Sequence, residues 1–122
     1  MKVVEVWIEG THALLQHRFS EQAEAAVGKA TRRVQIAHEC PRDVAERAAY
    51  REPDGSLYLP GAAISRLLRE AGGGHKQRGS RRTLKYIVPA AVIVVDEAVP
   101  LFAPDRTTRL TTFEVDARPV TI

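Results

Sequence analysis

Basic side chains are concentrated between Arg66 and Lys85. This stretch holds seven Lys or Arg and one acid, Glu70, a net charge of +6, whereas the whole chain carries only +3. Glycines at 72–74 and Gly79 interrupt the basic run and loosen its backbone. Such concentrated positive charge predicts a polyanionic partner. The candidate contacts are Arg66, Arg69, His75, Lys76, Arg78, Arg81, Arg82 and Lys85.

Lys and Arg in a glycine-spaced loop can follow a phosphate backbone, and that charge term is largely independent of base sequence. Trp7, Tyr58 and Tyr86 carry rings on which bases can stack. The combination favours a single-stranded nucleic acid as the partner, with Trp7 as an additional site residue. Two plainer interpretations stay open: the loop is a solvated charge run, and Trp7 is covered by a helix.

The chain shows no pattern typical of a catalytic or metal centre. His12 and His17 are five residues apart, which is not the spacing that places two metal ligands on one helical face. The glycine run follows the predicted helix instead of opening one, so it does not form a phosphate-binding loop. We therefore predict no catalytic residue, no metal and no cofactor.

Two other function classes remain as alternatives. His17 beside Arg18, or His75 beside Lys76, would suit metal-independent cleavage of RNA by general acid–base catalysis. The basic loop, residues 72–85, would also suit an acidic protein partner or another copy of the chain, as in a protein-interaction module.

Local signals around the basic loop predict a strand, a helix and a glycine stop. Residues 57–59 read as a short strand after a turn at 53–56. Pro60 suits the first turn of a helix, and Gly72 suits a left-handed residue at its end. The apolar stripe of this helix is Ile64, Leu67, Leu68 and Ala71.

The rest of the chain predicts one domain over 1–122 with mixed helix and strand. Expected strands cover 2–9, 83–96 with a break at Pro89, 99–102, 113–115 and 119–122, and expected helices cover 21–34 and 41–50. A polar hairpin tip is expected at 103–112. The order predicts an α+β fold, an RRM-like or ferredoxin-like antiparallel sheet with helices on one face and an inserted helical pair.

Composition bounds the location of the protein. A single cysteine, Cys40, excludes an internal disulfide and fits a reducing compartment. Glu5 and Glu9 interrupt the apolar run at the start, so we expect no signal peptide. The longest apolar stretch, residues 88–95, is too short to cross a bilayer. We therefore expect a cytoplasmic protein without a membrane partner.

Beyond these patterns, the segment D-G-S-L-Y-L-P-G-A-A-I-S-R-L-L-R, Asp54 to Arg69, resembles a known signature. It is similar to the strand followed by I-P-G-S-S-L-K-G-A-L-R of the RAMP superfamily, the RRM-like proteins that form the backbone of CRISPR effector complexes. Segments 13–19, 45–60 and 113–120 resemble motifs of small phage-encoded proteins with the same layout.

The resemblance implies an RRM-like core that holds a single strand across its sheet and loops and assembles side by side along it, in a bacterial or phage-infected cell. Arg66 and Arg69 match the basic positions of the family helix, and residues 72–82 take the place of its nucleic-acid-facing loop. No glycine-rich loop follows Gly79, which argues against the cleaving members. We thus predict a non-catalytic protein that binds single-stranded DNA or RNA and self-assembles along it.

Overall fold

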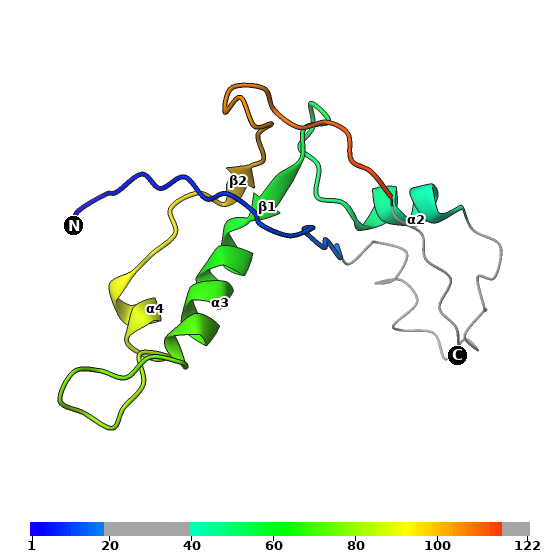
Figure 1. The fold of residues 1–122 in the computed structure, drawn as a ribbon. Coiled ribbons are helices and arrows are strands. Elements are labelled where there is room, and N and C mark those ends of the chain that lie inside the picture. Colours follow the sequence, from blue (N-terminus) through cyan, green and yellow to red (C-terminus); the bar gives the residue numbers. More distant parts are fainter. Residues whose placement is uncertain (19–39, 116–122) are drawn as a thin grey trace, which may run out of the picture. The chain divides into compact units, whose positions relative to one another are not determined.

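The computed structural model describes residues 1–18 and 40–115 (Figure 1). The described elements are α2 (Pro41–Ala48), β1 (Tyr58–Pro60), α3 (Gly61–Gly72), α4 (Val88–Ala91) and β2 (Ala98–Pro100). The described residues combine helices with an antiparallel pair of strands, which agrees with the predicted α+β class. The chain divides into two compact units, Met1–Ala49 and Tyr50–Ile122.

In the first unit, α2 confirms the helix predicted at 41–50. Pro41 occupies the first turn, where a missing N–H costs nothing. Asp43 lies near the positive end of the helix dipole and Arg47 near the negative end, and both placements stabilise the helix. The chain becomes extended at Ala49, which is buried. The helix predicted at 21–34 lies outside the described residues.

The strand predicted at 2–9 is not formed, and this prediction is wrong. The segment alternates apolar and polar side chains as expected, but a strand also needs a backbone partner. No described residue pairs with it as a ladder. Its apolar side chains are consequently exposed: Val3, Val4, Val6, Trp7 and Ile8.

The second unit is built on a short antiparallel pair, β1 with β2, in which Tyr58 lies opposite Pro100 (Figure 1). The strands predicted at 57–59 and 99–102 are confirmed, with each shifted by one or two residues. The N–H of Gly61 donates to the carbonyl of Glu97 at 2.8 Å and continues the pairing beyond β1.

A second hairpin follows β2 and confirms the polar tip predicted at 103–112. Phe102 bridges to Arg109, and the N–H of Leu110 donates to the carbonyl of Leu101 at 2.9 Å. The strand predicted at 113–115 is not formed, because no described segment supplies its ladder partner. The last predicted strand, 119–122, lies outside the described residues.

Asp105 holds the tip of this hairpin together. Its carboxylate accepts the hydroxyl of Thr108 at 2.6 Å and the N–H groups of Thr107 and Thr108 at 2.9 Å each. The hydroxyl contact and these amide contacts favour the charged form and lower the pKa of Asp105 from 3.8 to about 2.

We expect this tip to resist acid until well below the usual range for aspartate. A folded pKa below the unfolded value means that the stabilisation is present above pH 3.8 and is lost as the pH falls through about 2. Following the Asp105 carboxyl carbon by NMR should give a midpoint at about 2. An ordinary midpoint of 3.8 would show that the Thr108 contact is absent in solution.

Among the described residues of the second unit, few side chains are buried, and they lie at the end of the turn at 53–56. Leu57 and Ser56 are almost fully buried. Ser56 is not left unsatisfied, because its N–H and hydroxyl both donate to the Asp54 carboxylate, at 2.9 and 2.5 Å. Gly55 adopts a φ of 85°, which glycine accepts without strain. The predicted turn is thereby confirmed.

Helix α3 starts directly after β1, as predicted, but its end differs from the prediction. Gly72 lies inside the helix, and the residue after it, Gly73, is right-handed at φ −65°. The reason for a glycine here is packing: a Cβ on Gly72 would lie 3.0 Å from the carbonyl carbon and oxygen of Leu84. The returning chain therefore crosses directly over the helix end.

The buried strand predicted at 83–96 is wrong. Residues 88–91 form the short helix α4, with Pro89 in its first turn. The backbone turns extended at Val92, with φ −125° and ψ 125°. Beyond it Ile93 and Val95 are exposed. β-branched residues favoured a strand, but the sheet of the described residues has only β1 and β2 and offers them no ladder.

No helix among residues 1–18 and 40–115 combines the length and apolarity that crossing a bilayer requires.

Candidate nucleic-acid interface

The basic loop, residues 72–85, folds back on itself as a narrow hairpin. The N–H of Leu84 donates to the carbonyl of His75 at 2.9 Å, and the N–H of Gln77 donates to the carbonyl of Arg82, also at 2.9 Å. Lys76 bridges to Thr83 between these bonds. The loop thus has an ordered stem, so its cations are not spread along a free coil.

A tight turn closes this hairpin. The N–H of Ser80 donates to the carbonyl of Gln77 at 3.1 Å, which places Arg78 and Gly79 at the two central positions. Gly79 has a φ of 74°, the left-handed value that the third position of a type II turn requires. The Ser80 hydroxyl then accepts the N–H of Arg82 at 3.1 Å. The glycine that looked like a source of flexibility therefore fixes the turn.

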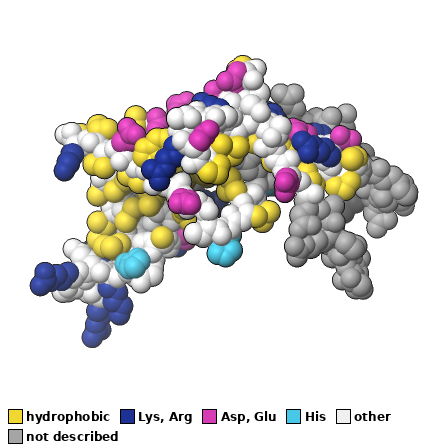
Figure 2. Space-filling model, turned by 45° about the horizontal axis from the view of Figure 1, so that its top comes forward, with side chains coloured by type: hydrophobic (Ala, Val, Ile, Leu, Met, Phe, Trp, Pro, Cys, Tyr) yellow, Lys and Arg dark blue, Asp and Glu magenta, His cyan; other side chains and the backbone are white. Residues whose placement is uncertain are grey.

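The cations of the hairpin are exposed and gathered at its end. Figure 2 shows a projecting lobe at the lower left whose end carries dark-blue Lys and Arg side chains. Within the part of the chain that the structure describes, these cations form no ion pair. We call them the tip cations: Lys76, Arg78, Arg81 and Arg82.

One acid, Glu70, partly neutralises the base of the hairpin. Its carboxylate lies 3.2 Å from the Lys85 ammonium and 3.0 Å from the Arg69 guanidinium. The hydrogen bond from Lys85 first, and then that from Arg69, lower the pKa of Glu70. These exposed pairs contribute little to stability. They do hold Arg69 and Lys85 at the stem and leave the tip cations as the free positive charge.

Arg66 lies on the exposed side of α3, beside a groove lined by Ala62, Ser65, Arg69 and Pro89.

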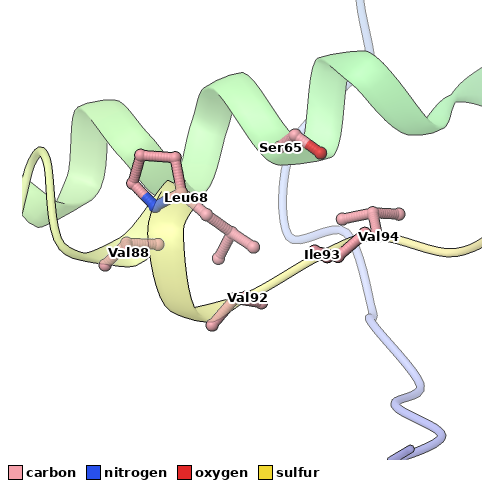
Figure 3. Close-up of a pocket in the computed structure, with 7 residues that line it drawn as sticks. Ser65, Leu68, Val88, Val92, Ile93 and Val94 are labelled. Atoms are coloured by element: carbon pink, nitrogen blue, oxygen red, sulfur yellow. The ribbon is translucent and has the colours of Figure 1, made fainter. Parts of the chain in front are cut away.

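A second groove shares Ser65 and Pro89 with the first and is apolar. Figure 3 shows Leu68 directed from α3 toward the segment of Val88 to Val94 that forms its other wall. The structure thus places Arg66, Arg69 and the tip cations in one unit, around α3 and the hairpin that follows it.

The aromatic candidates separate into three cases. Tyr58 packs on Tyr50 with ring centroids 5.6 Å apart, so its face is engaged within the fold. Tyr86 follows the hairpin directly and is 78% exposed, which makes it the ring best available for stacking in this unit. Trp7 belongs to the other unit, where its indole N–H donates to Glu5 at 3.0 Å. Its part in the site stays a prediction.

The predicted contact residues did not include Glu70, and Tyr86 was predicted only as one of three rings on which bases can stack. The position of Tyr86 one residue after Lys85 was a usable signal, because a ring beside a basic run can stack a base. Glu70 gave no such signal, since its contact with Lys85 depends on the hairpin returning to the helix.

The histidines of the described residues are surface groups. His75 is exposed in the hairpin stem, and the ring of His12 contacts the Thr11 hydroxyl at 3.0 Å. The described part of the chain contains no cluster of three His, Cys, Asp or Glu that would hold a metal ion. Cys40 is a free, exposed thiol.

Comparison with known proteins gives no match: no protein-family model, no curated protein and no solved structure is similar to this chain at a significant level. The function is therefore argued from the hairpin, its charges and its neighbours.

Proposed function

We propose that this protein binds single-stranded nucleic acid without cleaving it, and that copies assemble along the bound strand. The tip cations contact phosphates, and the helix arginines Arg66 and Arg69, with His75 and Lys85 at the stem, extend the contact surface. Tyr86 supplies a stacking face, and Trp7 adds a second one.

The observation that carries this proposal is the ordered basic hairpin. Its stem bonds and the turn at Gly79 present, on one short projection, four cations that form no ion pair with any described residue. A preorganised set of cations loses less side-chain freedom on binding than a free coil would. A single strand suits this projection because its flexible backbone can follow the hairpin end and its bases are open to stacking.

The fold that we propose for the whole chain is RRM-like. The antiparallel pair of β1 and β2, with α3 following β1 directly, supports this assignment. The resemblance of Asp54 to Arg69 to the RAMP signature supports it as well. An RRM-like sheet would hold the bound nucleic-acid strand on its open face, next to the basic hairpin.

Fluorescence anisotropy tests the proposed function directly. Labelled oligothymidylate, an RNA of the same length and a duplex are titrated with the protein at several salt concentrations. Binding to a single strand should weaken with salt, with a slope of about −0.7 for each phosphate neutralised, or about −3 for the four tip cations. Absence of binding to all three ligands would exclude the proposal, and the ratio of DNA to RNA affinity identifies the ligand.

Removing the counter-charge at the stem should strengthen binding. The Glu70→Gln variant releases Arg69 and Lys85 from their carboxylate while it keeps the size of the side chain. We expect affinity for the single strand to rise by about fivefold at 0.1 M salt, which is the gain expected from one additional phosphate contact. The slope of log affinity against log salt should become steeper by about 0.7.

The matched control for this prediction is Glu114→Gln, which removes an equal charge from an exposed position outside the hairpin. Equal effects of the two substitutions would mean that only net charge matters, and would contradict a specific role for the Glu70 contacts.

A further inference from the structure

Two grooves of the second unit adjoin each other along α3. The basic groove has a volume of about 500 Å³ and is lined by Ala62, Ser65, Arg66, Arg69 and Pro89. The apolar groove has a volume of about 200 Å³, shares Ser65 and Pro89 with the basic groove, and extends to the wall at residues 92–94 (Figure 3). A ligand that lies across this boundary meets cations on one side and aliphatic side chains on the other.

The basic groove carries positive charge that the described residues leave largely uncompensated. Arg66 forms no ion pair with a described residue, and no acidic side chain lines either groove. Arg66 and Arg69 are one turn apart on α3 and share a face with Ser65. Guanidinium groups and a hydroxyl are donors suited to a phosphate group.

The apolar groove is suited to a flat apolar group. Figure 3 shows Leu68 of α3 facing Val92 and its neighbours, and Ile93 in that wall is 71% exposed. Ser65 is the one polar side chain in the lining, and its hydroxyl forms no hydrogen bond with a described residue. Sites that bind small planar groups have this composition, with aliphatic walls and few polar groups. A nucleobase can place its face against the aliphatic side chains and its polar edge toward Ser65 or water.

We propose that the two grooves together hold one nucleotide of the bound single strand. The base enters the apolar groove, and the phosphate lies against Arg66 and Arg69 in the basic groove. The proposal rests on the proposed function and deepens it, because it adds a site for a base that is distinct from stacking on Tyr86.

The occupant is a nucleic-acid strand because the positive surface continues beyond the grooves. Arg69 is joined through Glu70 to Lys85 at the hairpin stem, at 3.0 and 3.2 Å, and the tip cations lie in the same hairpin. A nucleic acid has a phosphate at every nucleotide and supplies negative charge along this whole path. A protein segment with one or two carboxylates would match the charge of the groove alone. The apolar groove in turn disfavours a polyanion that has no apolar rings.

Two positions on the extended wall give a matched test. Ile93 lines the apolar groove, whereas Val95 is similarly exposed, at 68% against 71%, and lines neither groove. Anisotropy is measured with labelled hexathymidylate and with the same backbone lacking its bases. Ile93→Asn should weaken hexathymidylate binding about fivefold, since it places a polar group against an apolar face of the ligand. Its affinity for the abasic hexamer and its salt slope should stay those of the wild type, and Val95→Asn should bind both hexamers normally.

A second pair of variants blocks the boundary between the grooves. Ser65→Phe places a ring where the two grooves meet, and Ala63→Phe makes a similar change at an exposed position of α3 that lines neither groove. Ser65→Phe should lower affinity for hexathymidylate about tenfold, the effect of excluding one apolar group from its groove, and Ala63→Phe should not. This pair decides the test if circular dichroism shows that Ile93→Asn has lost its helices.

Photochemical cross-linking locates the base directly. A hexathymidylate with one diazirine-bearing base is irradiated on the wild-type protein, and the modified residue is identified by mass spectrometry. Cross-links should appear at residues 88–94. Cross-links confined to Tyr86 would mean that the bases only stack beside the hairpin, and would overturn the nucleotide site.

The two hexamers separate failure of this site from failure of the proposed function. If Ile93→Asn and Val95→Asn bind hexathymidylate equally well and with the same salt slope, the nucleotide site is wrong while the proposed function stands. If the wild type binds neither hexamer at low salt, the proposed function and the nucleotide site are both wrong.

Discussion

Replacing Arg78, Arg81 and Arg82 together by alanine should weaken single-strand binding by about 100-fold at 0.1 M salt. Each lost phosphate contact removes about 0.7 from the slope of log affinity against log salt, so three contacts remove about 2. The charge term vanishes at 1 M salt. Extrapolated from there to 0.1 M, this change in slope corresponds to a loss of about two orders of magnitude in binding affinity. Anisotropy with labelled oligothymidylate across a salt series measures both quantities.

The matched control replaces three arginines elsewhere, Arg42, Arg47 and Arg106, so that the net charge changes equally. This variant should keep most of its affinity, because the long-range field alone contributes less than direct phosphate contacts. If the hairpin variant binds as well as the control variant, the basic hairpin is not the binding surface. The fold should be intact in the hairpin variant, because Arg78, Arg81 and Arg82 are exposed and form no ion pair with a described residue.

The Gly61→Ala substitution should destabilise the second unit by about 3 kcal/mol, with a melting temperature lower by about 10 °C or more. Gly61 joins β1 to α3, and its N–H bonds to Glu97. A Cβ at this position would overlap the carbonyl oxygen of Asp96, which is backbone and cannot rotate away. The helix and the sheet pair would have to separate. Thermal unfolding followed by circular dichroism measures the loss.

Gly74→Ala is the control for this prediction. A Cβ on Gly74 would meet only the carbonyl oxygen of Ala71, at an ordinary distance of 3.6 Å. The control should unfold within about 0.5 kcal/mol of the wild type, as expected for a surface substitution. A Gly61→Ala protein as stable as this control would mean that β1 and the chain before β2 do not approach as closely as the structure shows.

Residues 53–71 were predictable because every signal there is local. Pro53, Asp54 and Gly55 specify a turn through their own backbone preferences, and Pro60 suits the start of a helix. The structure forms the turn, the strand and the helix in that order. Each of these features is decided by residues within about one turn of the chain.

The errors arose where an outcome depends on distant partners. Residues 2–9 and 92–95 have strand-forming side chains, but a strand exists only where another backbone completes it, and the described residues supply none. Gly72 was predicted as a left-handed helix end, whereas it is required by the passage of Leu84 across the helix. That crossing depends on how the hairpin returns, which no local pattern reports.

The same distinction between local signals and long-range contacts applies to the candidate site. Composition alone located the basic residues from Arg66 to Lys85, because charge can be counted from sequence. Their arrangement in space could not be predicted from the sequence, because the stem bonds of the hairpin and the pairing of Glu70 with Lys85 require residues up to 15 positions apart to meet. The separation of tip cations from neutralised stem cations is therefore a structural result.

The most direct test of nucleic-acid binding by the basic hairpin is an amide NMR titration of the full chain with unlabelled oligothymidylate. Salt-sensitive changes in chemical shift should concentrate at residues 75–85. The amide of Gly79 at the turn should show one of the largest changes. Arg66 and Arg69 should follow with smaller shifts. Saturating shifts elsewhere with residues 75–85 unmoved, or no shifts at low salt with either DNA or RNA, would contradict the account.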